Sequence, residues 1–300
     1  MGLSTLIHMA TKLPLLRSVR PMMCWVQSKR LGGLIRAYYR SNQSTEIREI
    51  LQFLESNPRV RLPLDTMPPY DYVREHRAED VEVQTDDSNG YSYVVCKGNR
   101  IYFPREYSSE VIRKAVVTAY TEQDRRSPHV YLSDTFGVDE GDSAVLAGAS
   151  DGIFCLSIVD RLSKVYLFEP DTRWHEPLSL TTGPWRGKVE IVPRFLGAAD
   201  TDNMVRLDTF FRDRPPIQYL QADVEGGERD LLCGAENTLR QNRKMRLSIC
   251  CYHKHEDASE LAEMLRRFGY DVGYSHGYFI MGLREPYLRR GVIYASRRAD

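Results

Sequence analysis

The sequence predicts an α/β protein with a doubly wound, mostly parallel sheet, preceded by an α+β region that contains a small antiparallel meander. After Gly141, short apolar segments alternate with helical patterns, which is typical of parallel strands joined by helices. Before residue 130, short apolar segments alternate with polar residues and are separated by turn residues, as in a meander. The composition, 42% hydrophobic and 27% charged over 300 residues, is that of a soluble globular chain long enough to bury a sizeable core.

The N-terminal 45 residues differ from the rest of the chain in charge. They contain seven basic residues and no acidic one, interleaved with apolar residues. We interpret 1–45 as a basic amphipathic segment. Four roles remain open for it: a terminal helix packed on the rest, a peripheral membrane contact, a partner contact, and an organellar transit peptide.

Residues 46–130 are predicted to form an accessory α+β region. A helical pattern at 46–55 is followed by an irregular, proline-rich connector at 61–72. The meander is expected to begin with alternation at Val81 and Val83 and to continue to residue 103. Ser108 is placed to cap a helix that ends near residue 123.

The remaining residues, 131–300, are predicted to form the sheet domain. Helices are expected at 153–159, from Leu231 to Leu239, where the apolar residues share one face, and after Asp257. We expect Asp257 to be the N-cap in a capping box with Glu260. The predicted strands are 144–147, 164–168, 188–192, 219–223 and 247–252.

Charge, hydropathy and cysteine content exclude several classes of protein. The 41 basic and 41 acidic residues balance, which argues against nucleic acid as the main partner. With a mean hydropathy of -0.44 and no apolar run near 18 residues, no transmembrane helix is expected. The six cysteines form no C-x-x-C pair, so a reducing cytoplasm is the simplest compartment.

The residues that follow the predicted strands are the candidate functional residues, because ligands bind beyond the carboxyl ends of the strands in such a sheet. Glycines there let the backbone approach a ligand, and a carboxylate can accept hydrogen bonds from both hydroxyls of a ribose. The joint placement predicts a ribose-containing ligand. The residues are Gly148, Ala149, Asp151 and Gly152 after the first strand, Glu169 after the second, Asp223 and Glu225 after the fourth, and His253 after the fifth.

The charges at these positions favour a cationic ligand over a dinucleotide. A dinucleotide loop needs a third glycine and a helix N-terminus open to pyrophosphate, but here Asp151 occupies the loop. Asp223 and Glu225 would also repel phosphate. S-adenosylmethionine carries a sulfonium, an ammonium and a ribose, so methyl transfer is the favoured chemistry. An NAD-linked oxidoreductase is the less favoured enzyme class.

These segments resemble the FkbM-type methyltransferase family in order and spacing across about residues 138–298. The resemblance implies a class I methyltransferase sheet, S-adenosylmethionine as cofactor, and O-methylation of hydroxyls on natural products, sugars or glycans. It also implies that the first glycine loop holds the methionine end, Glu169 the ribose, and Asp223 and Glu225 the floor near the transferred methyl. The matching segments are 141–154, 165–171, 207–210, 223–228, 233–235 and 252–253.

One position departs from the family pattern. Leu146 stands where the family usually has an acid that orients the methionine end of the cofactor. Either Asp151 or an acid from 223–228 takes over this contact, or cofactor binding is weakened. A non-catalytic scaffold that keeps the fold is therefore an alternative function.

The predicted function is a cytoplasmic S-adenosylmethionine-dependent O-methyltransferase acting on a saccharide or related polar acceptor. His253 is the first candidate for the base that assists a hydroxyl acceptor, with Asp223 or Glu225 second. His255 is expected to share a face with His253 along an extended strand, but no metal site is predicted because no ligand spacing is compelling. The expected partner is a small molecule or glycan acceptor, and the sequence does not indicate an oligomeric state.

Overall fold

The computed structural model describes residues 28–42, 44–58, 70–280 and 284–297 of the chain. Most of the basic segment 1–45 and most of the connector at 61–72 lie outside the described residues. Among the helices that are described, none is long and apolar enough to cross a membrane.

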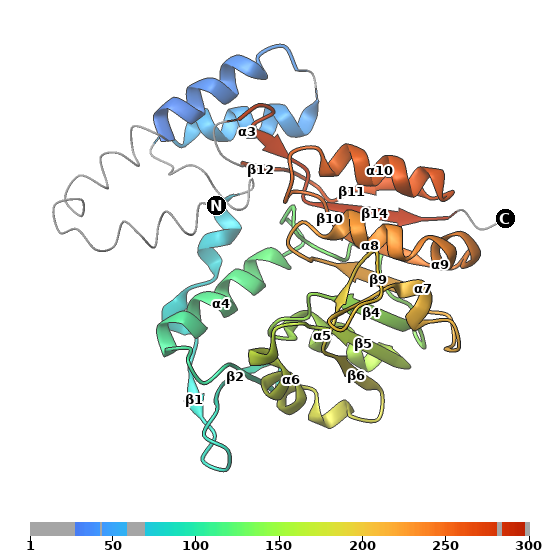
Figure 1. The fold of residues 1–300 in the computed structure, drawn as a ribbon. Helices are drawn as coiled ribbons and strands as arrows, with labels where there is room; N and C mark the ends of the chain where they lie inside the picture. The colour runs from blue at the N-terminus through green and yellow to red at the C-terminus, as the bar shows by residue number, and fades with distance from the viewer. Residues whose placement is uncertain (1–27, 43, 59–69, 281–283, 298–300) are drawn as a thin grey trace.

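A seven-stranded sheet forms the centre of the molecule (Figure 1). Its strand order is β11-β14-β10-β9-β4-β5-β6, and only β14 runs antiparallel to its neighbours. This arrangement is that of a class I methyltransferase sheet, so the predicted fold class is confirmed. The strands are β4 (Ser143–Ala147), β5 (Lys164–Phe168), β6 (Val189–Val192), β9 (Tyr219–Ala222), β10 (Arg246–Cys250), β11 (Asp271–Tyr274) and β14 (Val292–Ser296).

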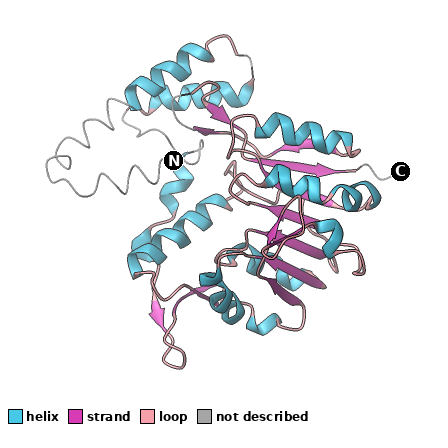
Figure 2. Ribbon diagram, viewed as in Figure 1, coloured by secondary structure: helices cyan, strands magenta, loops and turns pink. Residues whose placement is uncertain are grey.

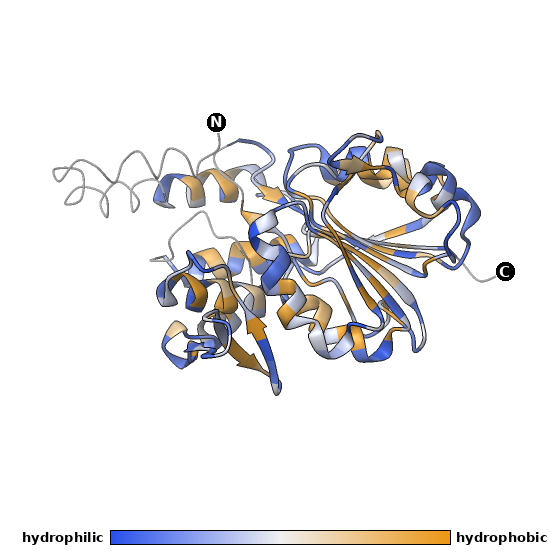
Figure 3. Cartoon of the chain, turned by 60° about the horizontal axis from the view of Figure 1, so that its bottom comes forward, coloured by the Kyte–Doolittle hydropathy of each residue, from blue (hydrophilic) through white to orange (hydrophobic). Residues whose placement is uncertain are grey.

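Helices cover both faces of this sheet, because alternate residues of each strand point to opposite sides. In β4, Val145 and Ala147 belong to the core on one face, while Ala144 and Leu146 belong to the core on the other. Figure 3 shows hydrophobic residues gathered along the sheet and on the helix sides that face it. The first face packs against α7 (Leu207–Phe210), α8 (Glu228–Gly234), α9 (Glu236–Gln241) and α10 (Asp257–Arg267), and the second against α4 (Ser109–Glu122), α5 (Ile153–Ile158) and α6 (His175–Thr181).

Two helix predictions were wrong in detail. The single helix expected from Leu231 to Leu239 is divided into α8 and α9, because Ala235 leaves the helical conformation between them with φ -111 and ψ 5. Asp257 is the first residue of α10 and not its N-cap. Its carboxylate accepts a hydrogen bond from the amide of Lys254, at 2.6 Å, so it points back into the preceding loop.

The accessory region consists of helices and a three-stranded meander (Figure 2). The strands are β1 (Gln84–Thr85), β2 (Ser92–Cys96) and β3 (Asn99–Tyr102), so the strand expected at Val81 and Val83 is wrong. The helix α3 (Thr45–Ser56) packs its Ile47 and Ile50 against a helix at 28–38, which forms part of the predicted basic segment. The apolar side of that helix is therefore buried within the protein.

The meander and α4 pack against the sheet domain and position the site. Ser108 caps α4 by accepting a hydrogen bond from Val111, as predicted. Tyr91 donates to Glu176 at 2.6 Å, and the amide of Tyr102 donates to the hydroxyl of Thr181 at 2.9 Å, so the meander is fixed to α6.

Short elements complete the fold. They are the parallel pair β7 (Phe195–Leu196) and β8 (Met204–Val205), the antiparallel pair β12 (Phe279–Ile280) and β13 (Leu288–Arg289), and the 3-10 turns Tyr70–Glu75, Ala78–Asp80, Val159–Arg161, Thr172–Trp174 and Gly183–Trp185.

Candidate functional site

A cavity of about 420 Å³ lies at the carboxyl ends of β4, β5 and β9. Of the candidate residues, Gly152 and His253 do not line it. The residues that do are Gly148, Ala149, Asp151, Glu169, Asp223 and Glu225. The structure therefore brings most of the candidates together in one cavity.

The glycine loop after β4 fixes one wall of this cavity. Gly148 has φ +81, and a Cβ added there would lie 2.0 Å from the carbonyl oxygen of Asp223. Only glycine allows this close contact between the ends of β4 and β9. Gly152, with φ +77, is the N-cap of α5 and turns the chain into that helix. Its role is thus to shape the loop from behind the cavity.

Glu169 is held at the end of β5 by backbone amides. Its Oε2 accepts from Ser150 at 2.8 Å and its Oε1 accepts from Asp171 at 2.9 Å. The side chain is only 6% exposed, so the carboxylate is fixed and largely desolvated. A carboxylate oxygen has two lone-pair directions, so each oxygen retains capacity to accept a hydroxyl of a diol.

Asp151 adds an unusual carboxyl to the same loop. Burial raises its pKa to about 6, although a 2.9 Å hydrogen bond from the amide of Ile153 lowers the pKa in part. The group is therefore ionised at neutral pH at some cost. A cation bound in the cavity would offset that cost.

Asp223 is surrounded by three side chains from distant parts of the chain. Tyr131 donates to its Oδ2 at 2.9 Å, and Nε2 of His129 lies 3.2 Å from the same oxygen. Its Oδ1 lies 3.3 Å from Nε2 of His253. Burial by itself would raise the pKa of Asp223, but the His129 hydrogen bond and both histidine charges outweigh it and lower the pKa to about 2. The carboxylate is a fixed negative charge.

His253 is a partner of Asp223 and does not itself line the cavity. Its Nδ1 lies 3.0 Å from Oε1 of Glu228, whose side chain is 1% exposed. Burial lowers the pKa of His253, but the Glu228 carboxylate and the other nearby acids outweigh it and raise the pKa. Both ring nitrogens thus face carboxylates. This geometry suits holding Asp223 in place better than accepting a proton from a substrate.

The expectation for His255 was wrong. Residues 251–256 form a loop and not an extended strand, so His253 and His255 do not share a face. Nδ1 of His255 instead lies 3.3 Å from the guanidinium of Arg289.

Glu225 occupies the rim of the cavity. Its side chain is 93% exposed, and its backbone has φ +54, which turns the chain sharply after β9. Its carboxylate lies 3.9 Å from Nε2 of His253. Glu225 is therefore the candidate acid in contact with both cavity and solvent.

Sequence reasoning missed part of the site. His129 is 2% exposed and contacts Asp223, and the hydroxyl of Tyr252 lies 3.0 Å from its Nε2. Tyr131, Tyr252 and Glu122 line the cavity. The signal was the segment 122–129 ahead of the first strand, where acids and a histidine cluster, but nothing in the sequence pairs it with Asp223.

Among the residues that the structure describes, two groups of side chains have ligand atoms close enough to hold a metal ion. One contains His129 and Cys250, the other Glu228 and His253, and both share Asp223. In each group a histidine nitrogen already lies within 3.3 Å of a carboxylate oxygen, and burial keeps the pKa of the Cys250 thiol well above its usual value. The histidines therefore already face carboxylates at ion-pair distance, and we propose no metal.

Leu146 faces the same side of the sheet as this cavity. It is 2% exposed, lines the cavity, and pairs in register with Gln221 of β9, which also lines it. The acids that line the cavity come instead from Asp223, Asp151 and Glu122 among others. The position of Leu146 thus contributes an apolar side chain, and no carboxylate, to the cavity wall.

One family model matches part of the chain. The model described as "Methyltransferase FkbM domain" matches residues 194–272, which include Asp223 and the helices α8, α9 and α10. The match confirms the resemblance to the FkbM-type family over residues 194–272 of the predicted 138–298. Among curated proteins, none matches the sequence significantly.

Solved structures with a similar fold include three methyltransferase or RNA-processing proteins. The methyltransferase FkbM from Methylobacillus flagellatus KT has 17% identity and a TM-score of 0.47, covering 64% of this chain and 56% of that chain. Precorrin-6y C5,15-methyltransferase from Geobacter metallireducens GS-15 has 10% identity and a TM-score of 0.39, covering 66% and 95%. The fibrillarin pre-rRNA processing protein of Methanococcus jannaschii has 12% identity and a TM-score of 0.37, covering 72% and 96%. The chain thus spans little more than half the length of the first of these.

Proposed function

We propose that this chain, whose residues 194–272 match the FkbM methyltransferase domain, is an S-adenosylmethionine-dependent O-methyltransferase of a saccharide or related polar acceptor. The observation that carries the proposal is the cavity at the ends of β4, β5 and β9. There a backbone-held carboxylate, Glu169, and a buried fixed charge, Asp223, line the same space.

The residues present fit this cofactor. Gly148 leaves room where a Cβ would meet Asp223, which brings the loop after β4 close to the end of β9. Glu169 suits a ribose diol, and the acids Asp151 and Asp223 suit an ammonium or sulfonium. When bound, S-adenosylmethionine supplies an electrophilic methyl group.

The side chains of this protein would position the reactants and manage one proton. Alignment alone contributes up to about 7–11 kcal/mol in favourable cases. Asp223, with a pKa of about 2, does not hold a proton near neutral pH, so its role is to attract and orient a cation. Glu225 contacts both cavity and solvent. We therefore assign it the role of accepting the proton from the acceptor's hydroxyl and passing that proton to water.

Polar groups at the cavity support a polar acceptor. Tyr131, Tyr252 and Glu122 offer hydroxyl and carboxylate groups there. The choice of oxygen as the methylated atom rests on the family resemblance. The five cysteines in the described part of the chain are unpaired thiols, which agrees with the proposed cytoplasmic location.

A non-catalytic scaffold is the second candidate function, and Leu146 is the observation that favours it. This side chain removes the acid that the family usually places at the methionine end. A scaffold would keep the fold and lose affinity for the cofactor.

Titration calorimetry of the full chain with S-adenosylhomocysteine tests the proposal. We expect micromolar binding, and we expect Glu169→Ala to weaken it about 10- to 100-fold, because charge-assisted hydrogen bonds contribute about 1.5–3 kcal/mol each. Glu190→Ala is the matched control, since Glu190 lies on β6 away from the cavity and pairs with Arg214. NAD should not bind.

Each other outcome has a defined meaning. Absence of S-adenosylhomocysteine binding at millimolar concentration would favour the scaffold. Binding of NAD in its place would favour the oxidoreductase. Unchanged affinity in Glu169→Ala would remove the ribose assignment.

A further inference from the structure

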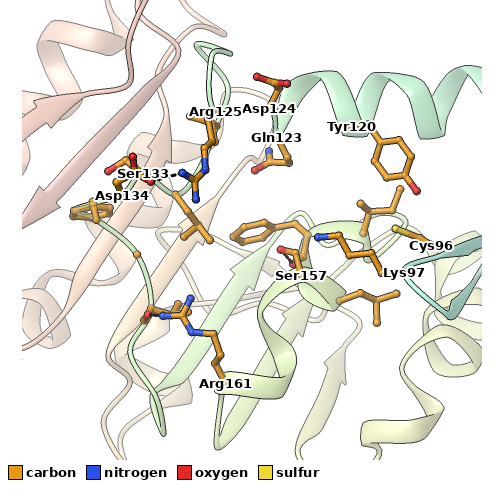
Figure 4. A pocket seen from close by; sticks show the side chains of 18 of the residues that line it. Cys96, Lys97, Tyr120, Gln123, Asp124, Arg125, Ser133, Asp134, Ser157 and Arg161 are labelled. Carbon is orange, nitrogen blue, oxygen red and sulfur yellow. Dashed lines mark hydrogen bonds and ion pairs between the residues drawn. The ribbon is translucent and has the colours of Figure 1, made fainter. Parts of the chain in front are cut away.

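A second and larger cavity, of about 740 Å³, adjoins the cofactor cavity (Figure 4). It lies between α4, the turn joining β2 to β3, α5, and the segment 130–139 that leads into β4. Gln123, Ile153 and Phe154 line both cavities, so the two spaces share a wall. Its size is in the range that holds a small organic ligand.

The shared wall leads directly to Asp223. The ring of Phe154 packs edge-on against Tyr131, with centroids 4.7 Å apart. Tyr131 in turn donates its hydroxyl proton to Asp223. The two cavities therefore adjoin at Phe154, next to the tyrosine that contacts Asp223.

Most charges around the second cavity are paired. Arg125 forms an ion pair with Asp134 at 2.5 Å, drawn in Figure 4. Arg246 pairs with Asp139 at 2.6 Å. The remaining acid, Asp124, is bound by Arg126. The three carboxylates that line this cavity are thus neutralised by neighbouring arginines.

Two cations in the lining remain without such a partner. Within the described ranges, neither Lys97 nor Arg161 has an acidic group at ion-pair distance, and the guanidinium of Arg161 donates only to the carbonyl of Val138. Figure 4 shows Lys97 extending from the turn between β2 and β3 toward Ser157 on α5, with Arg161 at the far end of that helix. Both residues are exposed, so their positive charges are accessible to an anion that enters the cavity.

We propose that the second cavity binds the methyl acceptor and that this acceptor carries an anionic oxygen group, a phosphate or a carboxylate, held by Lys97 and Arg161. The inference rests on the proposed function and specifies its substrate class. The anion occupies the end near α5 and the hairpin, and the hydroxyl to be methylated extends past Phe154. Apolar side chains of the wall, such as Leu132 and Phe136, pack against the body of the ligand.

Binding of three related sugars to the full chain, saturated with S-adenosylhomocysteine, tests this inference. Glucose 6-phosphate carries a phosphate, glucuronate carries a carboxylate, and glucose carries no anionic group. We expect millimolar or tighter binding of at least one anionic sugar by calorimetry, with no detectable binding of glucose. The better anion identifies phosphate or carboxylate as the recognised group.

Variants assign the binding to the two cations. Lys97→Gln and Arg161→Gln should each weaken anionic-sugar binding at least fivefold, and the double variant should abolish it. Lys114→Gln is the matched control, because Lys114 lies on α4 outside the cavity and pairs with Glu110. That variant should bind as the original chain does.

Three results would overturn the inference. The first is equal binding of glucose and the anionic sugars, and the second is equal binding by all variants. The third is no binding of either anionic sugar at about 10 mM, a concentration that would occupy even a site of millimolar affinity. The S-adenosylhomocysteine titration on the same samples separates this failure from failure of the proposed function. If that titration is positive, only the anionic acceptor is excluded.

Discussion

The two principal carboxylates of the cofactor cavity are held in opposite ways. Glu169 accepts both of its hydrogen bonds from backbone amides, of Ser150 and Asp171, within its own and the neighbouring strand-end loop. Asp223 is surrounded by side chains alone, from His129, Tyr131 and His253. Backbone amides do not titrate and follow loop geometry, whereas side chains titrate and come from distant parts of the chain. One side of the cavity is therefore fixed by backbone amides of two adjoining strand-end loops, and the other by side chains.

Gly148→Ala should produce the largest effect, because it disturbs both sides at once. The new Cβ would lie 2.0 Å from the carbonyl oxygen of Asp223, in a backbone with φ +81. We expect S-adenosylhomocysteine binding to be lost and the free energy of unfolding to fall by about 2–5 kcal/mol. Titration calorimetry and urea denaturation measure the two effects.

Gly187→Ala is the control for this change, because no atom lies within 4 Å of a Cβ added there. It should leave both quantities nearly unchanged. A Gly148→Ala protein that bound the cofactor product normally would show that the two strand ends are not rigidly joined.

The comparison also explains what the sequence could predict. The strand-end positions of Gly148 and Glu169 follow from local patterns, since glycine punctuation and strand length fix where the loop lies. His129 could not be paired with Asp223, because 94 residues separate them and only the folded sheet brings them together. The same limit applies to His253, whose orientation depends on Glu228 and on a loop that the sequence indicated as strand.

Asp223→Asn should have the second largest effect, and one that depends on pH. The pKa of Asp223 is lowered from 3.8 to about 2, so its contribution to stability is present above 3.8 and lost as pH falls through 2. The pKa values of His129 and His253 are raised above 6.5, so their contribution is present below 6.5 and lost as pH rises through the folded values. The contributions of Asp223 and of the two histidines to stability are therefore both present between pH 3.8 and 6.5.

The variant should therefore lose most stability, about 3 kcal/mol, between about pH 4 and 6.5, and less at pH 9. Urea denaturation at several pH values measures this difference. A pH-independent loss in Asp223→Asn would contradict the assigned histidine contacts.

Leu146→Asp should have the smallest effect on cofactor affinity, and it tests whether the Asp223 side is complete. Asp151 in the adjoining loop is already a carboxyl whose burial raises its pKa to about 6, and Asp223 and Glu122 line the same cavity. A further buried carboxyl would raise the pKa values of its neighbours instead of adding a full charge.

Leu146→Asn is the matched control, since asparagine has the same shape as aspartate without the charge. Both variants should lose stability through the loss of buried apolar contacts. We expect the two variants to bind S-adenosylhomocysteine with affinities within about threefold of each other, a difference of less than about 1 kcal/mol. If Leu146→Asp bound more than tenfold more tightly than Leu146→Asn, the missing acid would be a true deficit, and the scaffold function would gain over the enzyme.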